Sequence, residues 1–428
     1  MSTEISKVIG RRVWDSRGRP TIETEIHLIG GAIGRAIAPA GASTGSAEAV
    51  DKRDGGTAFG GYDVTRGVAA VNGEIADCLR GRDVTDQEGA DQTLIDLDAT
   101  PNKSRLGGNA LIATSMAIAH AAAAEARLPL WSYLGQHRED FFLPLPEIQI
   151  FGGGAHAGRR VDVQDFMVIA IGAESYTQAL EWTAEIYLAA GRIMRDAGLM
   201  QGVADEGGYW PAFDTNEQAL DYLMRAIEGA GLKPGEDVGI SLDIAATDFY
   251  HQGNYRLATD DRTVDADELS EMLLGWINRY PIVAIEDPLS ENDDDATASF
   301  TRAAGNGTEV VADDFICTSA ERIRQAAALG ACNTALIKPN QVGTLSEAKA
   351  AFEASRESGW ESIVSARSGE TEDTTIVHLA VGWGIKQLKV GSFARSERMA
   401  KWNEGLRIAE SLGQQGGDLS PREGFPWG

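Results

Sequence analysis

Short apolar runs in the second half of the chain each lead directly into a single acid or lysine. The runs GISLD, IVAIE, EVVAD, TALIK and QLK end at Asp243, Glu286, Asp313, Lys338 and Lys389. The shortest intervals between these residues are roughly 25 residues, the length of a strand, a crossover helix and two loops. Such units in series predict a parallel β/α barrel, in which the strand ends meet at one mouth.

The residues that end these runs have a common chemistry. Carboxylate oxygens are the ligands that Mg²⁺ prefers, and ammonium groups beside a metal suit an anionic substrate with a carboxylate or phosphate. An acid after an apolar run can also be a strand end that reaches water, and each residue taken alone leaves that alternative open. All five residues occupy the same position, at the end of an apolar run, and this favours a shared metal and substrate site.

The first third of the chain has a different pattern. Residues 5–40 alternate between apolar and polar positions around turn residues, which predicts a small antiparallel sheet. Residues 67–79, 86–98 and 109–126 then show helical spacing. This order of elements predicts an α+β domain ahead of the barrel.

The predicted domain boundary lies near residue 138, before the Pro-rich connector LPLPE at 143–147. It divides the chain into a capping domain, residues 1–138, and a barrel, residues 139–428. The loop AGASTG at 40–45 lies between the predicted sheet and helices. It is either a surface turn or a flexible lid whose Ser43 reaches a metal or phosphate.

Composition narrows the classes of function. The chain has 428 residues, 43% of them apolar, which is enough for two domains with a sizeable core. A net charge of −26 disfavours nucleic acid and anionic membranes as partners. The 3 cysteines show no CxxC spacing, which favours a cytoplasmic location over a disulfide framework or zinc cluster. With no basic-then-apolar leader and no apolar helix long enough to span a bilayer, we expect no membrane segment.

Longer motifs give the chain a resemblance to a known family over about residues 8–413. They are DSRGRPTIE at 15–23, AGASTG at 40–45, GGGAHAG at 152–158, VQDFM at 163–167, ADEGG at 204–208, SLDIAATDFY at 241–250, AIEDP at 284–288, IKPNQVGT at 337–344 and ARSGETED at 366–373. On these motifs the chain resembles enolases, which dehydrate 2-phosphoglycerate to phosphoenolpyruvate. The resemblance implies an enolase-type β/α barrel with an N-terminal α+β capping domain, two Mg²⁺ ions, and a homodimer or higher homo-oligomer.

The resemblance also implies roles for individual residues. Asp243, Glu286 and Asp313 match the ligands of the first Mg²⁺, and Ser43 matches the lid serine that joins the second. Lys338 matches the base that removes the α-proton, Lys389 the group that grips the carboxylate, and Glu206, paired with Asp165, the acid that assists departure of the hydroxyl. The residues that match substrate-binding positions are Arg367, Ser368, His156, Gln164 and Lys389.

These roles agree with elementary acid–base chemistry. A proton next to a carboxylate is too weakly acidic for a lysine unless a divalent metal and fixed cations stabilise the enolate. Lys338 must be partly neutral to act as a base, and we expect Lys389 and the metals to lower its pKa.

The chain also departs from the enolase pattern at the predicted mouth. Ala366 stands where enolases have a histidine near the leaving group, and Asp165 stands where they have a glutamate. Other departures are Ala40, Gly152 and Pro339. Because geometry at a reacting centre is sensitive to small displacements, these changes predict impaired handling of the hydroxyl while enolate formation is retained.

Arg159 and Arg160 follow directly after the glycine motif. They are either a solvated loop pair or a bidentate clamp for an additional phosphate or carboxylate.

The favoured function is therefore a Mg²⁺-dependent lyase or transferase that acts on 2-phosphoglycerate-type or phosphoenolpyruvate-type acids and is diverted to phosphorus transfer. In this respect the chain resembles carboxyphosphonoenolpyruvate synthases of phosphinate antibiotic pathways, whose substrates include nucleotide-activated phosphono acids. The alternatives are a plain enolase with unusual site residues and a catalytically weak binding or scaffold paralogue.

Overall fold

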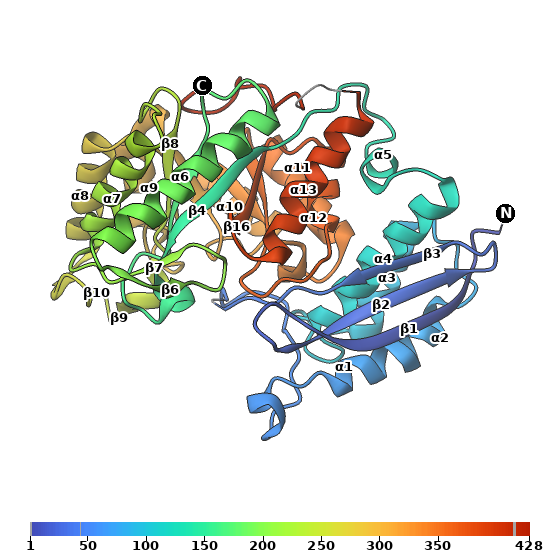
Figure 1. The fold of residues 1–428 in the computed structure, drawn as a ribbon. Coiled ribbons are helices and arrows are strands. Elements are labelled where there is room, and N and C mark those ends of the chain that lie inside the picture. Colours follow the sequence, from blue (N-terminus) through green and yellow to red (C-terminus); the bar gives the residue numbers. More distant parts are fainter. Residues whose placement is uncertain (1, 43, 414–416) are drawn as a thin grey trace.

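The structure is a computed structural model that describes residues 2–42, 44–413 and 417–428 (Figure 1). The predicted metal residue Ser43 lies outside the described residues. Figure 1 shows a small sheet with its helices, coloured blue to cyan, beside a larger barrel that contains the rest of the chain.

The N-terminal sheet consists of β1 (Ile5–Trp14), β2 (Pro20–Leu28) and β3 (Ile33–Ile37). Its strands are antiparallel in the order β1-β2-β3, which confirms the prediction for this segment. The helix α4 (Gly108–Ala126) packs against β2 and β3. At Gly34 a Cβ atom would lie only 2.1 Å from the backbone nitrogen of Ala121, so this close approach of strand and helix requires glycine.

The predicted helices of this region are present with small differences. Residues 67–79 belong to a helical segment that begins earlier and contains a π-helical turn, Val71–Ile75. The third helix is capped by Asp86, whose side chain accepts a hydrogen bond from the Gly89 amide. The elements are η1 (Ala58–Gly61), α1 (Thr65–Ala70), η2 (Val71–Ile75), α2 (Ala76–Leu79), α3 (Gln87–Asp98) and α5 (Leu130–Leu134).

The larger sheet closes on itself through the pairing of β16 with β4 and forms a barrel. Its strand order is β16-β15-β14-β13-β12-β8-β5-β4, and the hairpin of β7 and β6 extends from β4. These strands are β4 (Leu145–Gly152), β5 (Asp165–Ile169), β6 (Met200–Val203), β7 (Tyr209–Pro211), β8 (Gly239–Asp243), β12 (Ile282–Glu286), β13 (Glu309–Ala312), β14 (Thr334–Ile337), β15 (Glu361–Ser365) and β16 (Gln387–Ser392).

The barrel differs from the predicted all-parallel arrangement at β5. This strand runs antiparallel to both of its neighbours, β4 and β8. The chain between β4 and β5 contains only the short turn η3 (Gly154–Ala157), and a parallel pair needs a much longer crossover. As a result the beginning of β5, at Asp165, pairs with the end of β8, at Asp243, and lies at the same mouth as the ends of the parallel strands.

The other predicted strand ends lie at this mouth. β8 ends at Asp243 and β12 at Glu286, while Asp313 and Lys338 directly follow β13 and β14. Lys389 differs, because β16 continues beyond it to Ser392.

Helices cover the outside of the barrel (Figure 1). They are α6 (Tyr176–Asp196), α7 (Asn216–Gly229), α8 (Ala266–Arg279), α9 (Asp294–Ala304), α10 (Ala320–Leu329), α11 (Leu345–Glu357), α12 (Thr375–Trp383) and α13 (Ser396–Ser411). Short elements complete the fold: η4 (Ala246–Phe249), β9 (Tyr250–His251), β10 (Asn254–Leu257), β11 (Arg262–Val264), η5 (Gly305–Gly307) and η6 (Pro339–Gln341). None of the helices in the described part of the chain is long and apolar enough to cross a membrane.

Contacts between the N-terminal region and the barrel place the lid segment at the mouth. Ala40 forms an isolated β-bridge with Gly369, and the backbone amide of Ile37 donates to the Asp373 carboxylate at 2.9 Å. Ala40, the first residue of the AGASTG loop, therefore lies directly against the ARSGETED motif.

Candidate active site

A small cavity at the barrel mouth brings most of the predicted site residues together. It measures about 20 Å³, which is enough for a water molecule or an ion but not for a three-carbon acid. Its lining residues are His156, Gln164, Asp165, Glu206, Asp243, Lys338, Ser365, Ala366, Arg367, Ser368, Lys389 and Val390. A three-carbon acid therefore fits only if lining side chains move.

Lys389 lies between two of the predicted metal ligands. Its Nζ donates to Asp243 Oδ2 at 2.8 Å and to Glu286 Oε2 at 2.7 Å. Burial alone would lower the pKa of Lys389, but these carboxylates raise it well above its usual value. Burial and the nearby Asp243 raise the pKa of Glu286. Lys389 thus supplies the positive charge that these buried acids need.

Lys338 forms an ion pair with Asp313. Burial would lower the pKa of Lys338, but Asp313 raises it overall, so the sequence-based expectation of a lowered pKa is wrong for this arrangement. Thr318 Oγ1 accepts a hydrogen bond from the Lys338 backbone amide at 2.9 Å, and Gln341 Nε2 donates to Asp313 Oδ1 at 2.9 Å. Neither Thr318 nor Gln341 was predicted from the sequence to be a site residue.

The predicted metal ligands offer only oxygen atoms. Asp243, Glu286 and Asp313 are all buried, and Glu286 Oε1 has no hydrogen-bond partner among the described residues. A buried, unpartnered carboxylate oxygen beside two further acids fits Mg²⁺, which prefers carboxylate ligands. The three acids do not gather as closely as Asp287, Asp313 and Asp314, which each offer an atom within 4.8 Å of the others.

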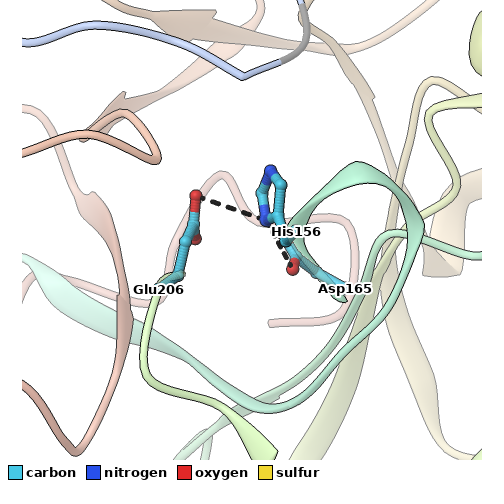
Figure 2. A group of neighbouring side chains, drawn as sticks. All are labelled: His156, Asp165 and Glu206. Carbon is cyan, nitrogen blue, oxygen red and sulfur yellow. Dashed lines mark ion pairs between the residues drawn. The ribbon is translucent and has the colours of Figure 1, made fainter. Parts of the chain in front are cut away.

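A second group of cavity residues contains a histidine, and its Asp165 lies 3.7 Å from Lys389 of the first group. His156 Nδ1 lies 3.8 Å from Asp165 Oδ1 and 3.6 Å from Glu206 Oε1 (Figure 2). Burial and Glu206 raise the pKa of Asp165 to about 6. Burial would also raise the pKa of Glu206, but His156 and nearby cations lower it overall.

Gln149 connects Asp165 to the segment that follows Glu206 and was not identified from the sequence. Its Nε2 donates to Asp165 Oδ1, and its Oε1 accepts from the Gly208 amide at 2.8 Å, two residues after Glu206. Gln149 lies in β4, shortly before the GGGAHAG motif. Nothing in the sequence indicates that its side chain reaches Asp165.

Arg367 is held by Glu48, which lies just beyond the AGASTG loop. Its guanidinium contacts Glu48 through Nη1–Oε2 at 2.9 Å and Nη2–Oε1 at 3.1 Å. Burial would lower the pKa of Arg367, but Glu48 raises it. The neighbouring Ser368 Oγ lies 3.2 Å from His156 Nε2. Sequence reasoning missed Glu48, because only the fold brings it to Arg367.

Other predicted residues lie at or outside the cavity. Gln164 Nε2 donates to Asp243 Oδ2 at 3.0 Å. Arg159 and Arg160 are exposed and do not line the cavity, and Arg159 pairs with Asp248 at 3.3 Å.

Two of the departures from the enolase pattern have visible structural consequences. Ala366 lines the cavity, so a larger side chain at this position would enter it. At Gly152 a Cβ atom would lie 2.7 Å from Cβ of Ala204, so the present backbone does not accept a side chain there.

The capped β/α barrel and the buried acids and lysines at its mouth together define the class of protein. The description "Enolase, N-terminal domain" matches residues 5–134, and "Enolase, C-terminal TIM barrel domain" matches residues 140–418. The chain therefore belongs to the enolase family and is an enzyme of the enolase superfamily. That family acts on small phosphorylated acids, and the acidic clusters at the mouth are suited to hold a metal.

Proposed function

We propose that this protein forms an enolate from a three-carbon acid that carries phosphate or phosphonate, in a Mg²⁺-dependent reaction diverted toward phosphorus transfer. Mg²⁺ held by Asp243, Glu286 and Asp313, with Ser43 at a second ion, would supply positive charge that stabilises the enolate. We also propose that the boundary between the two domains lies near residue 138 and that the protein assembles as a homo-oligomer.

In this proposal the two lysines have separate tasks. Lys338 removes the α-proton. The positive charge of Lys389 binds the substrate carboxylate. Lys338 accepts a proton only when neutral, so its pair with Asp313 must loosen before it can act. Arg367 and Ser368 bind the phosphate, which must compete with the Glu48 carboxylate for the same guanidinium.

The proposed diversion toward phosphorus transfer rests on one observation: Ala366 and Asp165 line the same cavity. At the first position a methyl group faces the cavity, where enolases have an imidazole. At the second, the shorter carboxylate is bound by Gln149. Both changes affect the departing hydroxyl, whereas the acids and lysines that serve the enolate are retained.

The proposed diverted step balances as a phosphorus transfer. An enolate oxygen on the carboxyl carbon, which is free although the C2 oxygen of a 2-phosphoglycerate-type acid carries phosphate, forms a bond to phosphorus of an activated phosphono acid. The bond from that phosphorus to the nucleotide phosphate oxygen breaks, and the nucleotide leaves with the electron pair. Arg159 and Arg160 are proposed to bind the nucleotide phosphates, since they are exposed beside the turn that carries His156.

A plain enolase is the second candidate, and one observation favours it. His156, Asp165 and Glu206 still converge, so acids for hydroxyl departure remain assembled. A scaffold paralogue is disfavoured, because a binding protein has no use for a buried cluster of costly charges.

A coupled absorbance assay for phosphoenolpyruvate formed from 2-phosphoglycerate tests the proposal. We expect slow dehydration together with measurable exchange of the C2 proton for deuterium from solvent. Dehydration at the rate of a typical enolase would overturn the diversion and support the plain enolase. Absence of exchange would mean that the acid enters as a ready-made enol, with Lys338 in an electrostatic role.

A further inference from the structure

Arg398 is a fully buried cation close to the cavity, although it is not one of the residues that line it. It lies in the first turn of α13, which packs against β16. Its Nη1 donates to the backbone carbonyl of Arg367 at 2.7 Å and to that of Val390 at 2.8 Å. Its Nη2 donates to the carbonyl of Ser368 at 2.6 Å. One guanidinium group therefore joins the segment after β15 to the middle of β16.

The three carbonyl groups that Arg398 binds lie where the regular strand pairing is interrupted. β15 ends before Arg367 and Ser368, so these two residues lie beyond the ladder that joins β15 to β16. Val390 lies where the register of β16 against β4 shifts. A buried carbonyl outside a ladder needs another hydrogen-bond donor, and Arg398 provides it at all three positions.

The shape of the arginine side chain suits this task. A planar guanidinium presents several N–H donors in a fixed fork, whereas a lysine has one compact ammonium group. The space around the side chain is also tight, because a Cβ atom at Gly391 would lie 3.2 Å from Cδ of Arg398. Arg398 Nε lies 3.4 Å from Glu397 Oε1 but has no hydrogen-bond partner among the described residues. The hydrogen bonds of Arg398 within the described part of the chain thus all go to backbone carbonyls at the site.

The residues that Arg398 holds belong to two different binding groups. Arg367 and Ser368 are the residues assigned above to the substrate phosphate. Val390 directly follows Lys389, which is assigned to the substrate carboxylate. All four residues line the cavity. The guanidinium of Arg398 therefore connects the backbone of the phosphate-binding group to the backbone of the carboxylate-binding group.

We propose that Arg398 is a positioning residue that sets the spacing between the phosphate-binding and the carboxylate-binding side chains. A ligand that carries both groups gains affinity from this spacing, because the two groups meet partners that are already in place. A ligand with phosphate alone uses only one of the two groups and gains little. This role rests on the proposed function, since it uses the tasks assigned to Arg367, Ser368 and Lys389.

Calorimetry of the full-length protein in saturating Mg²⁺ tests this role, with 2-phosphoglycerate and inorganic phosphate as the two probes. Wild type should bind 2-phosphoglycerate more tightly than inorganic phosphate. Arg398→Lys keeps the charge but cannot reach all three carbonyl groups. Its affinity for 2-phosphoglycerate should fall at least about tenfold more than its affinity for inorganic phosphate, the order of magnitude of a lost hydrogen bond to a charged group.

Lys103→Met is the matched control for Arg398→Met, because both variants remove a buried cation. Lys103 is 5% exposed, pairs with Glu347 at 2.8 Å and is not one of the cavity-lining residues. It should retain the wild-type preference for 2-phosphoglycerate, whereas Arg398→Met should lose it. Mg²⁺ affinity should be unchanged in the Arg398 variants, which separates a positioning role from general loss of structure.

Arg398→Lys with the wild-type preference for 2-phosphoglycerate, or wild type without any such preference, would overturn the positioning role. Wild type that shows the preference but never exchanges the C2 proton would instead leave Arg398 in its role and remove Lys338 from the role of base. If the Arg398 variants do not fold, NMR of the wild-type guanidinium groups decides. Hydrogens held by three carbonyls should exchange slowly with solvent at Arg398, and rapid exchange would refute the proposal.

Discussion

The two sides of the cavity neutralise their buried acids in different ways. On one side, Lys338 and Lys389 pair with Asp313, Asp243 and Glu286. On the other, His156 Nδ1 lies 3.8 Å from Asp165 and 3.6 Å from Glu206, and Lys389 also lies 3.7 Å from Asp165. The lysine side thus has two ammonium groups for an enolate, whereas the acids of the histidine side face an imidazole and share Lys389 at a longer distance.

This difference separates the two half-reactions of an enolase in space. Under the proposed function, proton removal depends on the lysine side, and hydroxyl departure depends on the histidine side. The departures from the enolase pattern at Ala366 and Asp165 affect the second side. The comparison therefore predicts that variants on the two sides affect different measurements.

Lys338→Ala should give the largest effect. Loss of a general base typically costs about 10²- to 10⁴-fold, so exchange of the C2 proton of 2-phosphoglycerate with deuterated solvent should become undetectable. NMR of the recovered acid measures this exchange. Exchange that persists in the variant would remove Lys338 from the role of base.

Asp313→Ala should weaken Mg²⁺ binding by more than about a hundredfold, because loss of an outer-shell partner alone costs about 10- to 100-fold. Calorimetry measures this affinity. Asp248→Ala is a useful control, since Asp248 contacts exposed Arg159 and lies outside the cavity lining. Unchanged Mg²⁺ affinity in Asp313→Ala would refute the assignment of this ligand.

The unmodified protein should dehydrate 2-phosphoglycerate at least about a hundredfold more slowly than a typical enolase, a barrier increase of about 3 kcal/mol. Ala366→His and Asp165→Glu should raise this rate, and their effects should be non-additive because both serve one step. Substrate affinity should change less, since Arg367, Ser368 and Lys389 are unaltered. Strictly additive effects would indicate that the two positions act separately.

Gln149→Leu should give the smallest effect, a loss of about tenfold in hydroxyl departure, typical of a lost outer-shell hydrogen bond. The substitution removes the link between Asp165 and the Gly208 amide. Proton exchange at C2 should be unchanged, and this split between the two readouts distinguishes a positioning role from general destabilisation.

The sequence predicted the lysine side better than the histidine side. Asp243, Glu286, Asp313 and Lys338 each end or follow an apolar run, so the barrel periodicity alone placed them at one mouth. The short chain between β4 and β5 makes β5 run antiparallel, but an expectation of repeated strand and crossover-helix units does not reveal this reversal.

The raised pKa of Lys338 was also missed from the sequence. The sequence placed both Lys338 and Asp313 at the mouth but did not show that they form a direct ion pair. Glu48 and Gln149 were missed for the same reason, because their partners lie in other elements.

The reversal of β5 has a consequence for how the site can be exchanged. Because the chain turns back at the mouth, Gln149, His156, Gln164 and Asp165 all lie in one uninterrupted stretch from β4 to the start of β5. The lysine side, in contrast, is assembled from strands spread over the rest of the barrel. One segment transplant could therefore replace most of the histidine side and leave the lysine side of the recipient intact, which makes this stretch a natural cassette for changing the reaction.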